Sequence, residues 1–333
     1  MGSQKRTKSR FSAKHLLALL AALLLVIALP LAIAACGDDE DSTETTMEST
    51  ETTMESTETT AAESGDMGEM GDINIGYIAW DECISTTYLW KNILEGQGYT
   101  VTLTQLDVAP TYAGLAAGDL DFFTDAWLPV THSDYWEQYG DQLEDLTIYN
   151  AGGTLELTVP AYMTDMNSIE DLAGNADMFG GQIIGIEPGA GLTRITREEV
   201  MPGYGLDDYT LVEGSTPAML AELRRAIQDE EPIVVTLWSP HWIYAAEDLK
   251  KLEDPQGLFG GNEEMHVVAR GGFSEDFSDV AGWLSNFTLD DETLAGLALM
   301  VIDEYGEGQE EEAISAWLEQ PEHQAMVDGW LGM

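Results

Sequence analysis

The sequence predicts an α/β fold in which two lobes close on each other about a hinge. Strand-like and helix-like segments alternate along most of the chain, which is the pattern that α/β architecture produces. The body that follows residue 72 has about 260 residues, too many for one simple core and enough for two lobes. A largely helical stretch runs from Trp283 to the end of the chain. We expect it to return to the first lobe and complete a clamshell.

The elements of the first lobe are read from the spacing of their apolar residues. In the helix expected at 87–97, Leu89, Ile93 and Leu94 share one face. In the strand expected at 100–106, apolar residues alternate with threonines. The other strands of this set are expected at 73–78 and 120–124, and the other helices around 111–117 and at 134–146.

A second set of elements begins near Thr154. Thr216 suits a helix N-cap, and Pro217 suits the first helical position after it. Residues 313–318 form a later helix, and the last segment contains Trp330. The strands of this set are expected at 182–186, 209–212, 232–237 and 265–269, with a helix at 193–200.

Paired glycines mark the places where the chain is expected to pass between lobes. Gly152-Gly153 and Gly271-Gly272 permit bending because glycine has no Cβ. These crossings assign residues 73–153 and 272–333 to lobe I and residues 154–271 to lobe II.

Residues 1–36 have the pattern of an export signal. Basic residues precede an apolar stretch from Leu16 to Ala35. The stretch ends in Ile33-Ala34-Ala35-Cys36, which resembles a bacterial lipoprotein cleavage box and implies lipidation of Cys36. A transmembrane anchor is the alternative, since the apolar run is nearly long enough to span. Either interpretation puts the remaining chain outside the cytoplasmic membrane, attached to its outer face or in a periplasm.

Residues 37–72 are predicted to be a disordered acidic tether. A Thr/Ser/Glu heptapeptide beginning at Thr43 recurs from Thr50 and partly from Thr57. The repeat lacks the paired apolar positions of a coiled coil. Its acidic residues repel one another, so the segment is expected to give the folded body reach from the lipid anchor.

Charge and cysteine content exclude several classes of function. The chain has 61 acidic and 13 basic residues, a formal net charge of −48. Phosphate binding needs cations, so nucleic acid is excluded as a partner. Self-repulsion of this size is screened at molar salt, where the Debye length is about 3 Å, and predicts a salt-rich habitat. Cys83 is read as a buried small residue, and no histidine pair has metal-ligand spacing, so we expect neither metal nor cofactor.

Three tryptophan-bearing segments supply the candidate site. Trp80, Trp127 and Trp238 each fall at or just past a strand-like run. In α/β proteins these strand ends form the ligand crevice. Several indole faces meeting there make a box for a quaternary ammonium ion, which is held by cation–π attraction.

Taken alone, Trp80 is better explained as a core tryptophan at a strand end. The charged pair Asp81-Glu82 after Trp80, and a proline soon after each of the other two, indicate a chain emerging into solvent. Three strand exits are then best explained by one crevice. The other tryptophans are assigned to packing: Trp242, Trp90, Trp136, Trp283, Trp317 and Trp330.

A betaine also carries a carboxylate, for which the sequence offers a second set of groups. Gly189-Ala190-Gly191 links a strand to a helix, where backbone N–H groups can face an anion. His241, three residues after Trp238, can donate a hydrogen bond to the same carboxylate. We read His132 as a surface or hinge histidine.

Together these segments resemble the glycine-betaine-binding proteins of ABC-type osmoprotectant importers, the OpuAC-like type II substrate-binding class. The resemblance runs from about Ile73 to the C-terminus. Its most specific parts are Gly76-Tyr77-Ile78-Ala79-Trp80-Asp81-Glu82, the segment from Asp125 to His132, the Gly189-Ala190-Gly191 turn, and Trp238-Ser239-Pro240-His241-Trp242.

The resemblance implies a type II periplasmic-binding-protein clamshell that closes on its ligand. Trp80, Trp127 and Trp238 then surround the trimethylammonium group. His241 and the backbone N–H groups of Gly191 and Leu192 hold the carboxylate. Leu192 stands where the family often has another aliphatic residue, and only its backbone matters. The implied partners are a membrane permease and its ATPase.

Two other functions stay open at this stage. A solute-sensing receptor subunit would have an identical box. An exported hydrolase is a third class, but Ser239 precedes a proline at a strand exit and lacks a nucleophile elbow. Within transport, proline betaine, carnitine or choline could replace glycine betaine. We therefore expect a binding protein and not an enzyme.

Overall fold

The computed structural model describes residues 70–333. The predicted export signal at 1–36, the lipidation at Cys36 and all but the last three residues of the predicted tether lie outside this range. Within residues 70–333, none of the helices combines the length and the apolar content that crossing a bilayer requires.

A mixed sheet forms the centre of the folded body, with strand order β2-β1-β3-β9-β4-β7-β5-β6, and β8 pairs with β4 off this path. β1 runs parallel to β2 and β3, and β5 runs parallel to β6 and β7. The strands are β1 (Asp72–Tyr77), β2 (Thr100–Gln105), β3 (Phe122–Leu128), β4 (Leu143–Pro160), β5 (Gln182–Ile184), β6 (Thr210–Val212), β7 (Val235–Ser239), β8 (Leu249–Lys251) and β9 (Glu263–Arg270).

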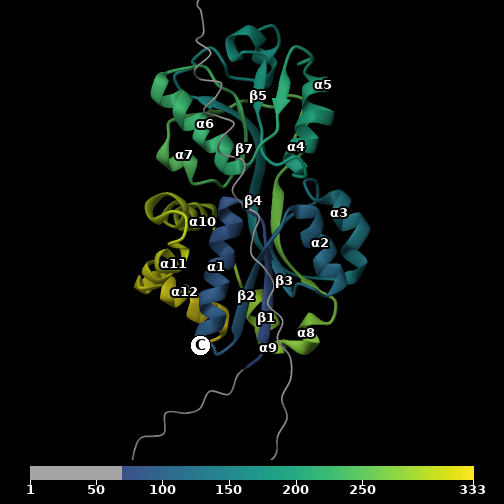
Figure 1. Ribbon diagram of the computed structural model, residues 1–333, viewed down its shortest axis with the longest axis vertical. Helices are drawn as coiled ribbons and strands as arrows, with labels where there is room; N and C mark the ends of the chain where they lie inside the picture. Colours follow the sequence, from purple (N-terminus) through teal and green to yellow (C-terminus); the bar gives the residue numbers. More distant parts are fainter. Residues whose placement is uncertain (1–69) are drawn as a thin grey trace, which may run out of the picture. The chain divides into compact units, whose positions relative to one another are not determined.

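The helices gather in two groups around this sheet, one beside β1–β3 and one beside β5–β7 (Figure 1). The first group contains α1 (Asp81–Gly96), α2 (Val108–Ala117), α3 (Ser133–Tyr139), α8 (Phe273–Asp276), α9 (Ser278–Ser285), α10 (Asp291–Ala298), α11 (Glu310–Leu318) and α12 (Pro321–Leu331). The second contains α4 (Gly191–Ile195), α5 (Met201–Gly203), α6 (Thr216–Asp229) and α7 (Ile243–Ala246). Shorter turns are the 3₁₀ helices Gly140–Gln142, Ile169–Leu172 and Ala176–Phe179 and the π-helical Thr196–Val200 and Leu299–Tyr305.

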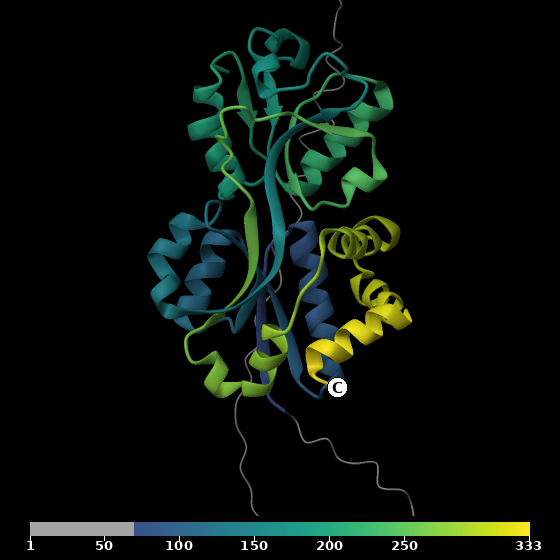
Figure 2. The same ribbon diagram turned by 180° about the vertical axis from the view of Figure 1, so that it is seen from behind.

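The long strand β4 connects the two groups. Its first part pairs with β9 and its last part with β7. Figure 2 shows β4 and β9 side by side between the two groups of helices. Because β9 also pairs with β3, strand pairing brings the chain back to the first group by Glu264, earlier than the predicted crossing at Gly271-Gly272. The lobe ranges derived from the glycine pairs stay a prediction.

An aromatic column supports the C-terminal half of α1. Trp90 packs on Phe287 and Trp330 with ring centroids 5.4 and 6.2 Å away, and Tyr149 stacks on Phe287 at 5.0 Å. Trp90 and Tyr149 are fully buried. The column therefore fixes α1 against both β4 and the C-terminal helices, as predicted from the helical return.

Three local predictions were wrong. α1 begins at Asp81, six residues before the predicted start, and Asp81 and Glu82 are 3% exposed instead of facing solvent. Acidic residues suit a first helical turn because they face its positive end. The helix predicted at 134–146 ends at Tyr139, because the chain from Leu143 pairs with β9. Ser215, not Thr216, caps α6 by accepting a hydrogen bond from the Ala218 N–H.

We predict that Gly153→Ala destabilises the protein by about 1–3 kcal/mol through overpacking. A Cβ at this buried position in β4 would lie 2.8 Å from Trp127 Cζ3 and 2.9 Å from the Glu263 carbonyl oxygen. Urea unfolding followed by tryptophan fluorescence measures the effect.

Gly282→Ala is the matched control. Gly282 lies inside α9, and its added Cβ would meet nothing within 4 Å. Removing a helical glycine should stabilise by about 0.5–1 kcal/mol. Equal unfolding midpoints for the two variants would contradict the close packing at Gly153.

Candidate functional site

A cavity lies where elements of the two groups meet. It contains about 290 Å³ of empty space, part of it open to solvent. Its walls come from the end of β3, the start of α1, the middle of β4, the end of β7 and the turn into α4. The lining residues are Trp80, Glu82, Trp127, Thr131, Leu155, Ile186, Ala190, Gly191, Leu192 and Trp238.

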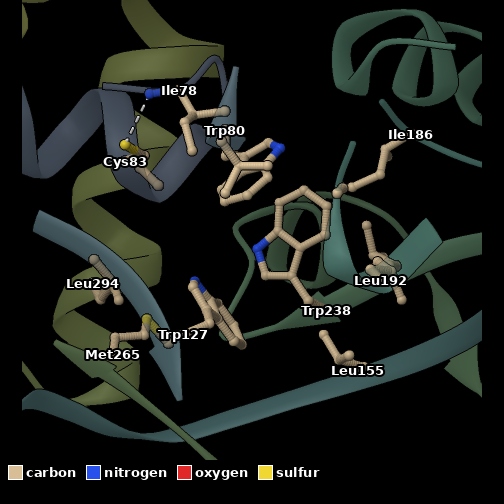
Figure 3. Packing of buried hydrophobic residues seen from close by; sticks show 14 of the residues in the cluster. Ile78, Trp80, Cys83, Trp127, Leu155, Ile186, Leu192, Trp238, Met265 and Leu294 are labelled. Carbon is tan, nitrogen blue, oxygen red and sulfur yellow. Dashed lines mark hydrogen bonds between the residues drawn. The ribbon is translucent and has the colours of Figure 1, made fainter. Parts of the chain in front are cut away.

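The three predicted tryptophans meet at this cavity. Figure 3 shows their indole rings gathered around one space, with Leu155, Ile186 and Leu192 on the side of β4 and α4. Each ring is buried, with 3–5% of its residue exposed. Trp80 follows β1 and occupies the N-cap position of α1, whereas Trp127 and Trp238 lie inside their strands. Strand ends from different parts of the chain thus supply one aromatic box.

Two of these rings donate a hydrogen bond from the indole N–H to a carboxylate. Trp80 Nε1 donates to Glu187 Oε2 at 3.2 Å, and Trp127 Nε1 donates to Asp125 Oδ1 at 2.9 Å. The Trp238 indole N–H is buried and has no hydrogen-bond partner within the described part of the chain. Edge anchoring does not occupy the π faces that line the cavity.

Gly191 and Leu192 form the first turn of α4 against Thr131. A Cβ on Gly191 would lie 2.1 Å from the Thr131 carbonyl oxygen, so only glycine allows this approach. The N–H groups of a first helical turn have no partner inside their own helix. Two N–H groups therefore reach the cavity wall, where an anionic group can accept from them.

His132 is fully buried beside the box, so its interpretation as a surface or hinge histidine was wrong. Its ring stacks on Trp80 with centroids 5.6 Å apart. Its Nδ1 accepts a hydrogen bond from the Trp127 N–H at 3.0 Å, which assigns the proton of the neutral ring to Nε2. Burial, with a smaller effect of the Arg194 charge, lowers the pKa of His132 to about 3. Nε2 has no partner among residues 70–333, so it is an available neutral donor.

His241 is buried behind Trp238 and is not among the lining residues. The two ring centroids are 4.7 Å apart. Nδ1 accepts from the Ile243 N–H at 3.1 Å, and Nε2 lies 3.4 Å from Asp81 Oδ2 without forming a hydrogen bond. Burial lowers the pKa of His241 to about 3. Trp242, assigned to packing from the sequence, donates from Nε1 to Asp81 and also lies outside the lining.

Two buried carboxyl groups lie at the box, Asp125 and Glu82. Asp125 Oδ1 accepts from Trp127 Nε1 and from the Tyr149 hydroxyl, while Asp125 Oδ2 and Glu82 Oε2 have no partner among the residues described. Burial raises the pKa of Asp125 to about 7. Burial and the negative charge of Asp125 raise the pKa of Glu82 well above its usual range.

Sequence reasoning missed half of the lining: Glu82, Thr131, Leu155, Ile186 and Ala190. For Glu82 a signal was available. Ser85, Thr86 and Thr87 follow it without any charge, and all three are fully buried in α1. An uncharged helical run after an acidic pair indicates a buried helix start. Leu155 carried no such signal, since it reaches the cavity only because β4 crosses it.

Comparison with protein families gives one match. The model described as the substrate binding domain of ABC-type glycine betaine transport system matches residues 71–320. Among curated proteins, the glycine betaine/carnitine transport binding protein GbuC of Listeria monocytogenes is 38% identical over 138 residues. This alignment covers 41% of the present chain and 45% of GbuC, less than half of that relative's length. The glycine betaine/proline betaine-binding periplasmic protein of Escherichia coli is 23% identical over 74% of this chain and 84% of its own.

Solved structures give the same fold over most of the chain. The lactococcal OpuAC structure, closed and complexed with glycine betaine, has a TM-score of 0.72 and 32% identity, covering 78% of this chain and 99% of its own. The ProX structure from Borrelia burgdorferi has a TM-score of 0.73 and 30% identity, with coverage of 78% and 96%. A choline-binding ABC-transporter protein in complex with choline has a TM-score of 0.72 and 26% identity, with coverage of 78% and 91%.

Proposed function

Because this chain belongs to the OpuAC family, the substrate-binding domains of ABC-type glycine betaine transport systems, we propose that it captures glycine betaine or a related quaternary ammonium solute for import. Its α/β fold is that of the type II periplasmic binding proteins OpuAC and ProX. The observation that carries the proposal is the convergence of Trp80, Trp127 and Trp238 on one cavity.

The box suits a cation that has no hydrogen to donate. A quaternary ammonium group attracts indole faces, and each desolvated face contributes about 1–2 kcal/mol. Glycine betaine also needs partners for its carboxylate. We assign these to the backbone N–H groups of Gly191 and Leu192 and to a buried histidine. The solved relatives with glycine betaine and with choline support a site of this kind.

Two histidines compete for the carboxylate. His241 is the candidate from the sequence, and its Nε2 faces Asp81. His132 is the candidate that the geometry adds. Like His241 it is not itself a lining residue and its Nε2 has no acceptor in the described structure, but its ring stacks on the cavity-lining Trp80 and its Nε2 does not face a carboxylate. We propose His132 as the first donor and retain His241 as the alternative.

The proposed activity is binding and release, with no chemical step. The protein would work outside the cytoplasmic membrane, held by lipid on Cys36, and deliver its ligand to a permease and its ATPase. The binding-protein family supports the transport role. The lipid anchor rests on the cleavage-box pattern of residues 33–36 alone.

Trp238→Ala is expected to weaken glycine betaine binding by about tenfold or more, because the box loses one cation–π face. Isothermal titration calorimetry at molar salt measures the dissociation constant. Trp283→Ala is the control, since Trp283 lies in α9 away from the cavity lining. Unchanged affinity in a folded Trp238 variant would refute the box.

His132→Ala is expected to weaken glycine betaine at least tenfold and to leave choline, which has no carboxylate, within a factor of about three. His241→Ala is the matched variant, a second buried histidine beside a box tryptophan. If His241→Ala alone shows this ligand-selective loss, the carboxylate belongs to His241. Equal losses for both ligands in both variants would remove either histidine from the carboxylate role.

We also propose that the acidic surface reflects a salt-rich habitat. The described body has eight basic residues, which are Lys91, Arg194, Arg197, Arg224, Arg225, Lys250, Lys251 and Arg270, against several times as many carboxylates. The thermal unfolding midpoint should rise from low to molar salt as self-repulsion is screened. A midpoint independent of salt would remove this proposal.

A further inference from the structure

Two buried carboxylate oxygens beside the aromatic box have no hydrogen-bond partner in the described chain, Glu82 Oε2 and Asp125 Oδ2. Glu82 lines the cavity from α1 and is 3% exposed, and Asp125 is fully buried on β3, two residues before Trp127. Buried polar atoms are normally paired, so two unpaired oxygens at one site need a reason. Neither side chain makes an ion pair with a lysine, arginine or histidine within residues 70–333.

We propose that Glu82 and Asp125 share one proton in the empty protein and release it to solvent when a quaternary ammonium group enters the box. This inference rests on the proposed function, because it assumes that the three tryptophans hold such a cation. In this proposal the two carboxyl groups make the site favour ligands that carry a positive charge. At the box the charges balance: one ammonium group enters, one proton leaves to solvent, and the net charge around the pair is unchanged. The carboxylate of glycine betaine binds the separate donors assigned to it above.

The geometry couples this pair directly to the box. Asp125 Oδ1 accepts from the Nε1 of Trp127, so the carboxyl group is bonded to a ring whose face lines the cavity. Glu82 lines the same cavity from the first turn of α1, next to Trp80 at the N-cap. The Thr86 hydroxyl donates to the Glu82 carbonyl oxygen at 2.9 Å. A second hydrogen bond joins the hydroxyl groups of Thr86 and Thr124, which ties α1 to β3 at this point.

Burial makes two negative charges unfavourable here and one cation favourable. A buried carboxylate loses hydration, and a second carboxylate nearby adds repulsion, so the pair retains a proton. Both pKa values are raised accordingly, that of Asp125 to about 7. A quaternary ammonium ion donates no hydrogen bond, so it can stabilise the pair only by charge. Its arrival lowers both pKa values and expels the proton.

The other titratable groups around the pair differ from it either in their pKa values or in their position relative to the cavity. From β4, Tyr149 donates its hydroxyl to Asp125, and burial raises its pKa well above 10. Burial also raises the pKa of the Cys83 thiol on α1. His132 and His241, with pKa values of about 3, are neutral above pH 5. Asp81, raised by burial to about 6, titrates in the relevant range, but it bonds Trp242 and lies outside the lining.

The sign of the pH dependence follows from proton release. Where the empty pair holds a proton and the complex does not, affinity rises with pH by up to about tenfold per unit. The raised pKa values of the empty pair set the upper end of this window. Above it, the pair is ionised in both states and affinity is flat. Choline and glycine betaine should behave alike, because neither ligand titrates in this range.

The test is calorimetric titration of the purified full-length protein with choline and with glycine betaine at molar salt. Titrations at pH 6 in two buffers of different ionisation enthalpy give the protons released per ligand, and a series from pH 5 to pH 8 gives the slope. We expect close to one proton released for each ligand and an affinity that rises up to about tenfold per pH unit. Glu82→Gln should reduce both the proton release and the slope toward zero. Asp125→Asn should do the same, since the amide oxygen can still accept from Trp127.

Glu156→Gln is the matched control, a buried carboxyl group on β4 that pairs with Lys251 outside the cavity lining and should leave the proton count unchanged. Proton release that persists in folded Glu82→Gln and Asp125→Asn, or that disappears in Glu156→Gln, would overturn the assignment to the pair. Binding of either ligand with no proton release and no pH dependence would overturn this inference and leave the proposed function standing. No binding of either ligand at any pH by the folded protein would instead overturn the proposed function.

Discussion

The buried start of α1 is the constraint on which the site depends. Trp80, Asp81 and Glu82 are consecutive, and each is at most 5% exposed. Trp80 forms a wall of the box and bonds Glu187, Asp81 accepts from Trp242, and Glu82 lines the cavity. Three adjacent side chains therefore reach segments from three other parts of the chain. The aromatic column at Trp90 and Tyr149 keeps the helix in place, so the positions of all three side chains follow from it.

The unpaired polar atoms around the cavity indicate the chemistry of its ligand more specifically than the apolar wall does. His132 Nε2 is a neutral donor, and the first-turn N–H groups of α4 are further donors. Glu82 and Asp125 supply acceptors that lack a cation in the described structure. Unpaired groups of both kinds beside indole faces suit a small dipolar solute, positive at one end and negative at the other. This is the chemistry of a betaine, the class of ligand that we propose.

Periodicity predicted most elements because it is a local property. The strands β1, β2, β6 and β9 begin and end within two residues of their predicted ranges, and the helices after Trp283 lie where apolar spacing put them. The failures are at segments whose state depends on distant partners. β4 became a long strand because β9 and β7 pair with its two parts. Asp81 and Glu82 became buried because Trp242 and the cavity lie against them, which no local pattern of charge reveals.

The sequence by itself determined the α/β class, the acidic character and the three tryptophans of the box. Strand ends can be recognised from local apolar runs, and net charge follows from composition alone. Only the tertiary structure decided which side chains share the cavity with those rings. His132 follows Trp127 by five residues and looked peripheral, yet the turn after β3 folds it back onto the Trp127 N–H and beside Trp80. Glu82 and Asp125 are far apart in sequence and meet only because α1 packs on β3. The burial of a side chain and its distance from other charges depend on residues from the whole chain, and these come together only when the chain folds.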